Sequence, residues 1–231
     1  MANCFRPKPG PPTAAIGGKI LPPPNWPESD LTPVELITFY PCPADGTLPA
    51  TLTADGTLYQ AGYTPCYRTD KPTTFSLTHL MGQLRVHICV EDEADQQYPL
   101  DNAKIELCGS GTIDYPHLRL LPTGEASSLA LGTFVTESSS SGQQWVTEQT
   151  FVIIPQTLRQ GEPCLTFTAG TNSYVFIPQK DVPLLQGKLN HLTLGAATEP
   201  GGSQKVQLLE VQSISIDDWS EGGDLGNGEA T

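Results

Sequence analysis

Basic residues are scarce in this chain, which has 12 lysines and arginines against 25 aspartates and glutamates. Nucleic acid is therefore excluded as a partner, because binding it requires a basic patch and the formal net charge here is −13. Long apolar runs are also absent, and no stretch approaches the roughly 20 residues of a transmembrane helix. No signal peptide is visible in the sequence.

Helices of useful length are not expected either. Glycine and proline number 22 each, and proline lacks an amide hydrogen while glycine costs backbone entropy in a helix. Short β-branched and aromatic runs recur instead, separated by turn signals such as Asp45-Gly46 and Asp55-Gly56. The pattern predicts an all-β chain built from β-sandwiches, with a short strand over residues 57–59 between two turns.

The clearest strand pattern covers residues 74–90. Apolar residues alternate with polar ones in two sets, first Phe75 and Leu77, then Leu84, Val86, Ile88 and Val90. One face of this segment is therefore predicted to be buried. The two sets are out of phase, so the chain must bend between His79 and Gln83, and Gly82 is the natural place.

Further strands are predicted in the second half of the chain. They cover residues 151–154, ended by Pro155, and residues 206–216, with a hairpin turn at residues 170–172. A flexible loop is expected over residues 138–142. Trp145 lies beside this loop and is either an exposed aromatic for stacking on a sugar or a core residue.

Catalytic machinery is not recognisable. The four histidines lie far apart in the sequence, and there is no serine-hydrolase elbow, zinc-protease motif or phosphate loop. We therefore expect no enzyme activity, no cofactor and no metal site. His87 is expected to be exposed and His79 to make a structural hydrogen bond. A glycosidase, which needs only two carboxylates across a cleft, is the remaining enzymatic alternative.

The six cysteines show no CxxC or zinc-finger spacing. Cys89 and Cys108 fall inside apolar strand patterns and are predicted to be buried thiols. Cys42 and Cys66 flank a turn-rich stretch, so a disulfide between them is left open. For Cys4, the alternative to a thiol or a disulfide is attachment of a lipid.

Four regions are predicted along the chain. Residues 1–30 are proline-rich and are expected to form a tether or an incomplete first strand. Residues 31–122 and 123–220 are expected to form an N-terminal and a C-terminal β-sandwich domain. Residues 221–231 are expected to form a flexible acidic tail.

Five segments in this order resemble the fimbrillin family of Bacteroidetes, whose subunits build type V pili. They lie at residues 36–41, 75–84, 153–157, 185–188 and 214–222. The residues that carry the resemblance are Phe75, His79, Leu84, Pro155, Gln156 and Trp219. Trp219 is expected to pack against the C-terminal core.

The resemblance implies two tandem transthyretin-like, Greek-key β-sandwich domains. It also implies an exported lipoprotein of the outer membrane and cell surface, with other pilus subunits as partners and a lipid anchor as its only membrane contact. Trimming by a protease after Arg6, Lys8 or Lys19 would precede polymerisation by donor-strand exchange. Whether such a subunit is a tip, a stalk or an anchor stays open. The alternative is a monomeric surface module that binds a glycan or a host protein.

Overall fold

The computed structural model describes residues 4–5, 13–16, 19–21, 33–67, 76–90, 99–139, 142–170, 172–196 and 206–218. All regular elements in these ranges are β-strands, so the predicted all-β class is confirmed. This part of the chain contains no helix with the length and apolarity needed to cross a membrane. Predictions for Arg6, Lys8, Phe75 and Trp219 fall outside the described residues.

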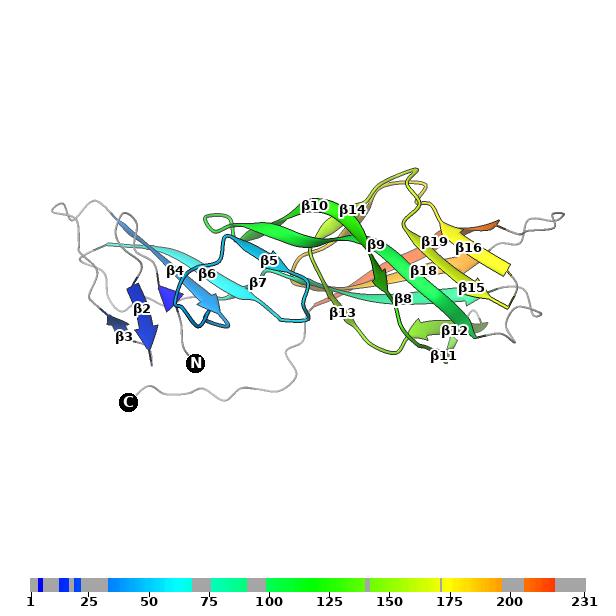
Figure 1. Cartoon of the computed structure of the whole chain (residues 1–231), viewed down its shortest axis with the longest axis horizontal. Coiled ribbons are helices and arrows are strands. Elements are labelled where there is room, and N and C mark those ends of the chain that lie inside the picture. Colours follow the sequence, from blue (N-terminus) through cyan, green and yellow to red (C-terminus); the bar gives the residue numbers. More distant parts are fainter. Residues whose placement is uncertain are drawn as a thin grey trace.

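The largest of the four sheets formed by the described strands has eleven strands (Figure 1). Its main path runs β10 (Arg119–Ala130), β9 (Leu100–Asp114), β15 (Leu165–Ala169), β16 (Asn172–Phe176), β19 (Val206–Asp218), β18 (Lys188–Ala196), β8 (Gly82–Val90), β12 (Gly142–Thr147) and β11 (Phe134–Ser139). In addition, β5 (Thr51–Thr53) pairs with β9, and β13 (Phe151–Ile153) pairs with β8. Most neighbours are antiparallel, but β8 runs parallel to β18 and β16 runs parallel to β19.

Three smaller sheets complete the described structure. One joins β4 (Val34–Tyr40), β6 (Gln60–Cys66) and β7 (Thr78–His79). Another pairs β14 (Gln156–Leu158) with β17 (Val182–Leu184), and the third joins β1 (Cys4–Phe5), β2 (Thr13–Ile16) and β3 (Lys19–Leu21). Figure 1 shows an elongated molecule with β4 and β6 toward one end and β15 and β16 toward the other.

Two large hydrophobic cores lie along this length, beside a small cluster of Val34, Leu36 and Cys66. The larger contains residues of β8, β9, β15, β16 and β18, among them Leu84, Ile105, Phe167, Tyr174 and Leu192. The second contains Phe39, Ala61, Leu80, Met81 and Leu120. β9 contributes Ile105 to the first core and Ile113 to the second, so one strand belongs to both. The predicted boundary between residues 122 and 123 falls within β10, and the division into two domains stays a prediction.

The bend predicted near Gly82 is confirmed. β7 ends at His79 and β8 begins at Gly82, and the side chains of Leu84, Val86 and Ile88 are fully buried. A Cβ atom at Gly82 would lie 2.7 Å from the carbonyl oxygen of Leu185. Glycine is therefore required by the close approach of another backbone.

The hairpin predicted near Gly170 is also present. β15 and β16 are antiparallel with Ala169 opposite Asn172, and Gly170 has a φ of 58°. The flexible loop predicted over residues 138–142 is wrong for Ser138, Ser139 and Gly142, which are paired residues of β11 and β12. Residues 140 and 141 lie outside the described residues.

Residues 57–59 do not form the predicted strand. Asp55 instead closes a turn, with its Oδ1 accepting a hydrogen bond from the amide of Thr57 at 2.9 Å. Tyr59 then packs its ring against the second core. Turn chemistry thus prevails over strand propensity here.

The cysteines answer one question that the sequence left open and correct one prediction. Cys42 is disulfide-bonded, whereas Cys66 is a buried reduced thiol, so these two residues do not pair. Cys89 is buried as predicted, but Cys108 is only half-buried. Alternation along β9 points Leu107 into the core and its neighbour Cys108 to the other face. Cys164 is also buried, and this burial raises the pKa of its thiol to about 12.

Candidate functional site

Gln156 fills a gap beside β9. β15 pairs with β9 up to Ile105 and β5 pairs with it from Ser110, which leaves the intervening backbone without a strand partner on this edge. The Gln156 side chain occupies this place: its Oε1 accepts a hydrogen bond from the Cys108 amide at 2.9 Å, and its Nε2 donates to the Cys108 carbonyl at 3.3 Å. The side-chain amide thus replaces one peptide unit of a strand.

A second amide side chain joins the bend at His79 to the start of β10. Gln186 Nε2 donates to the carbonyl oxygens of His79 at 3.0 Å and Leu118 at 2.7 Å, while its Oε1 accepts from the Leu120 amide at 3.1 Å. The His79 ring lies 3.0 Å from Gln60 Nε2. The structural hydrogen bond expected of His79 is therefore present.

The other predicted site residues are placed in three environments. Leu84 belongs to the large core, and Pro155 is half-buried directly before β14. Trp145 is half-buried, packs against the large core, and lies opposite Ile88 in the neighbouring strand. Lys19 begins β3, where only the backbone is described.

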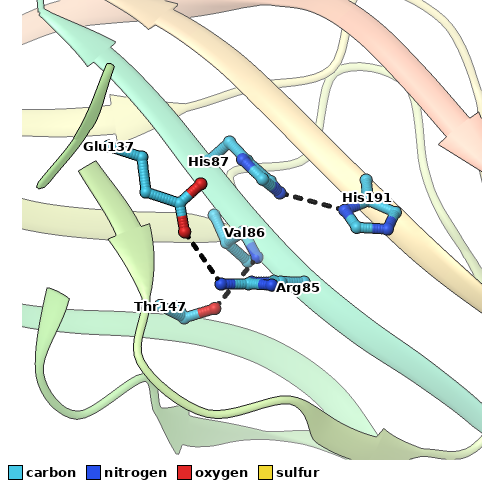
Figure 2. A network of polar contacts seen from close by, with 6 residues as sticks. All are labelled: Arg85, Val86, His87, Glu137, Thr147 and His191. Atoms are coloured by element: carbon cyan, nitrogen blue, oxygen red, sulfur yellow. Dashed lines mark hydrogen bonds and ion pairs between the residues drawn. The ribbon is translucent and has the colours of Figure 1, made fainter. Parts of the chain in front are cut away.

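A polar network lies on the outer face of the large sheet (Figure 2). His87 on β8 and His191 on β18 approach each other, with 3.0 Å between Nε2 of the first and Nδ1 of the second. Next to them, Arg85 Nη2 donates to Glu137 Oε1 at 3.0 Å. The prediction that His87 is exposed is wrong, because the pairing of β18 with β8 brings a second ring onto it and leaves it half-buried.

The environment of His87 in this network lowers the pKa of its imidazole. Burial is the largest cause, because it disfavours the charged form, and the neighbouring His191 and Arg85 act in the same direction. The Glu137 carboxylate opposes them. The short nitrogen–nitrogen contact requires one ring to donate and the other to accept, so at least one imidazole is neutral.

We expect acidification from pH ~7 to ~5 to destabilise the wild-type protein more than a His87→Gln variant. Below a pH of about 6.5 the unfolded chain protonates this histidine, whereas the folded protein resists protonation to a lower pH. The unfolded state then binds more protons, so stability falls as the pH falls. Urea unfolding of both proteins at the two pH values measures the difference, and equal losses would contradict the assignment.

The side chains of this network connect neighbouring strands. Within the described ranges, no three side chains of His, Cys, Asp or Glu converge on a point where an ion could bind. The Thr147 hydroxyl is buried, and its Oγ1 accepts a hydrogen bond from the Val86 amide at 3.2 Å (Figure 2). The arrangement therefore ties β8 to β11, β12 and β18.

The edge strand β10 carries features that discourage pairing with another chain. Among the described strands it pairs only with β9, and its register shifts between Thr123 and Ala126. Pro122 cannot donate a backbone hydrogen bond, Gly124 has a φ of 87°, and Glu125 is exposed. Proline, a bulge and a charge are common means of protecting a sheet edge.

Comparison with known proteins finds similarity in structure only. No family model and no curated protein matches the sequence. A candidate cell adhesion protein from Bacteroides uniformis superposes with a TM-score of 0.55 at 14% identity, over 95% of this chain and 91% of that one. The chain has the fold of that protein.

Two further structures are similar at lower TM-scores. A candidate cell adhesion protein from Bacteroides ovatus gives 0.47 at 16% identity, over 92% of this chain and 80% of that one. The fimbrial anchor protein Mfa2 from Porphyromonas gingivalis gives 0.45 at 10% identity, over 94% and 88% of the two chains. The resemblance to Bacteroidetes fimbrillins predicted from the sequence is confirmed at the level of the fold.

Sequence reasoning missed His191, Gln186 and Asn190 as key contacts. His191 meets His87 only because β18 runs beside β8, and strand order is not encoded in local alternation. Gln186 and Asn190 flank Gly187, whose φ is 65°, so they look like ordinary turn residues. The five-segment resemblance already included residues 185–188 and was the one available signal.

Proposed function

We propose that this chain is a structural or adhesive subunit of a bacterial cell-surface fimbria of the type V pilus class. The observation that carries the proposal is the fold shared with the Bacteroides uniformis adhesion protein over nearly the whole length of both chains. Two tandem transthyretin-like domains, lipoprotein export to the outer membrane and a non-enzymatic role belong to the same proposal. Its partners would be other pilus subunits.

The end of the molecule formed by β4 supports assembly by strand exchange. β4 is hydrogen-bonded to β6 on one edge, and β1 lies beside it. Val34 and Leu36 of β4 are buried, with exposed fractions of 2% and 5%. Once the disulfide bond of Cys42 is reduced, cleavage after Arg6 or Lys8 would detach β1, and cleavage after Lys19 would detach β2 as well. A strand from a neighbouring subunit could then occupy the vacated position.

We expect limited trypsin digestion to convert the purified protein into oligomers. Trypsin does not cleave before Pro7 or Pro9, so mass spectrometry under reducing conditions should show loss of an N-terminal peptide ending at Lys19. Size-exclusion chromatography should show a shift to larger species. The matched control is the triple variant Arg6→Gln, Lys8→Gln, Lys19→Gln, which should stay full-length at this end and monomeric. A trimmed wild-type protein that remains monomeric at high concentration would contradict strand exchange.

A surface groove that is lined by both apolar and polar side chains favours the second candidate function, a monomeric module that binds a glycan or host protein. The groove has a volume of about 370 Å³ and lies over β9, β15 and β16. Its lining includes the polar residues Asn102, Lys104, Thr166, Thr168 and Ser173. Such hydroxyl, amide and ammonium groups can hydrogen-bond to sugar hydroxyls. A trimmed protein that stays monomeric but binds immobilised glycans would support this function.

A further inference from the structure

A small pocket lies where the turn after β9 meets the ribbon formed by β4 and β6. Its volume is about 190 Å³. The side chains that matter most in its lining are Glu35, Ile37, Tyr63, Ile113, Asp114 and Tyr115. Sites for whole small molecules usually measure about 300–1,000 Å³. The pocket therefore suits a single inserted side chain.

The register of β4 explains why this pocket combines apolar and acidic groups. Phe39, Ile37 and Glu35 follow one another along one face of the strand. Phe39 packs in the second core, Ile37 lies opposite Tyr63 of β6, and Glu35 is one step further from the core. This face of β4 therefore carries a core side chain at Phe39 and a carboxylate at Glu35, only four residues apart.

The hydroxyl groups of the two tyrosines in the pocket already take part in hydrogen bonds within the protein. Tyr115 donates to the carbonyl oxygen of Pro49 at 2.8 Å. Tyr63 is hydrogen-bonded to Glu35, and this bond is the largest cause of its raised pKa, followed by burial and the charge of the carboxylate. The Tyr115 hydroxyl is therefore already engaged as a donor, and the raised pKa keeps the Tyr63 phenol protonated.

The two carboxylates of the pocket, Glu35 and Asp114, can each accept further hydrogen bonds. Each ionised carboxylate has about four acceptor positions. Glu35 uses one for Tyr63, and Asp114 Oδ2 lies 2.8 Å from Nδ1 of the exposed His117. A ligand in the pocket must consequently bring hydrogen-bond donors, and a positive charge would complement the two anions.

We propose that this pocket binds a basic side chain of a partner protein, arginine in preference to lysine. Ile37 and Ile113 offer apolar contact to the methylene stem, as long basic side chains require. The Tyr63 ring can stack on a planar guanidinium, whose fork of donors suits a carboxylate better than an ammonium does. The net charge of −13 also favours approach of a basic surface.

The proposal goes beyond the fimbrial role and concerns the monomer, so it can fail or succeed independently of strand exchange. The test is titration of the ¹⁵N-labelled, full-length protein with acetyl-Gly-Arg-Gly-amide, followed by NMR chemical shifts. We expect saturable shifts around Tyr63 and Asp114. The same peptide with citrulline in place of arginine should bind about tenfold more weakly, because the charge-assisted hydrogen bonds are lost.

Matched variants separate the pocket from general surface charge. Glu35→Gln with Asp114→Asn should abolish the saturable shifts, while Glu137→Gln, which removes a carboxylate on the distant polar network, should leave them unchanged. If the double variant does not fold, Glu35→Gln alone still keeps an oxygen for the Tyr63 hydroxyl and should weaken binding. Equal binding of the citrulline peptide, unchanged binding by the pocket variants, or preference for a neutral methyl glycoside would overturn the proposal.

Discussion

Replacing Asn190 with alanine is expected to lower the free energy of unfolding by about 3–5 kcal/mol, since each buried polar group left unpaired costs about 1–3 kcal/mol. The side chain is fully buried. Its Oδ1 accepts from the Leu185 amide at 2.8 Å, and its Nδ2 lies 2.9 Å from the Gln83 carbonyl and 3.2 Å from those of Leu185 and Lys188. Urea unfolding against wild type measures the loss.

Two further variants test whether hydrogen bonding is the cause. Gln149→Ala removes an exposed amide and should change stability by less than about 0.5 kcal/mol. Asn190→Asp keeps the acceptor for the Leu185 amide but places a buried carboxylate against carbonyl oxygens. Its pKa should be raised in the folded state, so this variant should regain stability as the pH falls. A loss of under 1 kcal/mol for Asn190→Ala would refute the role assigned to this side chain.

Gln156→Leu is expected to destabilise the protein by about 2–4 kcal/mol, because two backbone groups of Cys108 lose their partner. Leucine keeps much of the volume, so the change reports on hydrogen bonding more than on packing. Hydrogen exchange gives a local readout: the Cys108 amide should lose protection more than the amides of β15.

The matched control for this prediction is Gln160→Leu. Gln160 is exposed and precedes Gly161 in a turn, so its replacement should leave both stability and exchange at Cys108 unchanged. If Gln156→Leu and Gln160→Leu behave alike, the gap beside β9 is filled by something other than this side chain.

Local alternation predicted the strands well because burial of one face leaves a direct trace in the sequence. Leu84, Val86 and Ile88 are buried as expected, and Gly82 and Gly170 sit where the backbone needs glycine. Alternation does not specify which strands are neighbours. The pairing of β8 with β18, and with it the half-burial of His87, depends on residues about a hundred positions apart.

Polar side chains that act in place of backbone were harder to recognise. Gln156 was identified only through the family resemblance, and its function as a substitute peptide unit appears once β5 and β15 are seen to leave a gap. Asn190 has no local signature, because an asparagine near a glycine turn usually faces solvent. Cys108 was misassigned since its apolar neighbours on β9 face the opposite way.

The participation of β9 in both cores has a mechanical consequence. Its 15 residues span about 50 Å at the usual rise per residue of a strand, and they run along the long axis of the molecule (Figure 1). Tension applied between the two ends would load the hydrogen bonds of β9 with β10 and β15 in shear, so that many must break together. Pulled as a link in a chain, the protein would resist as one unit, because extending it requires β9 to slide out of two cores at once.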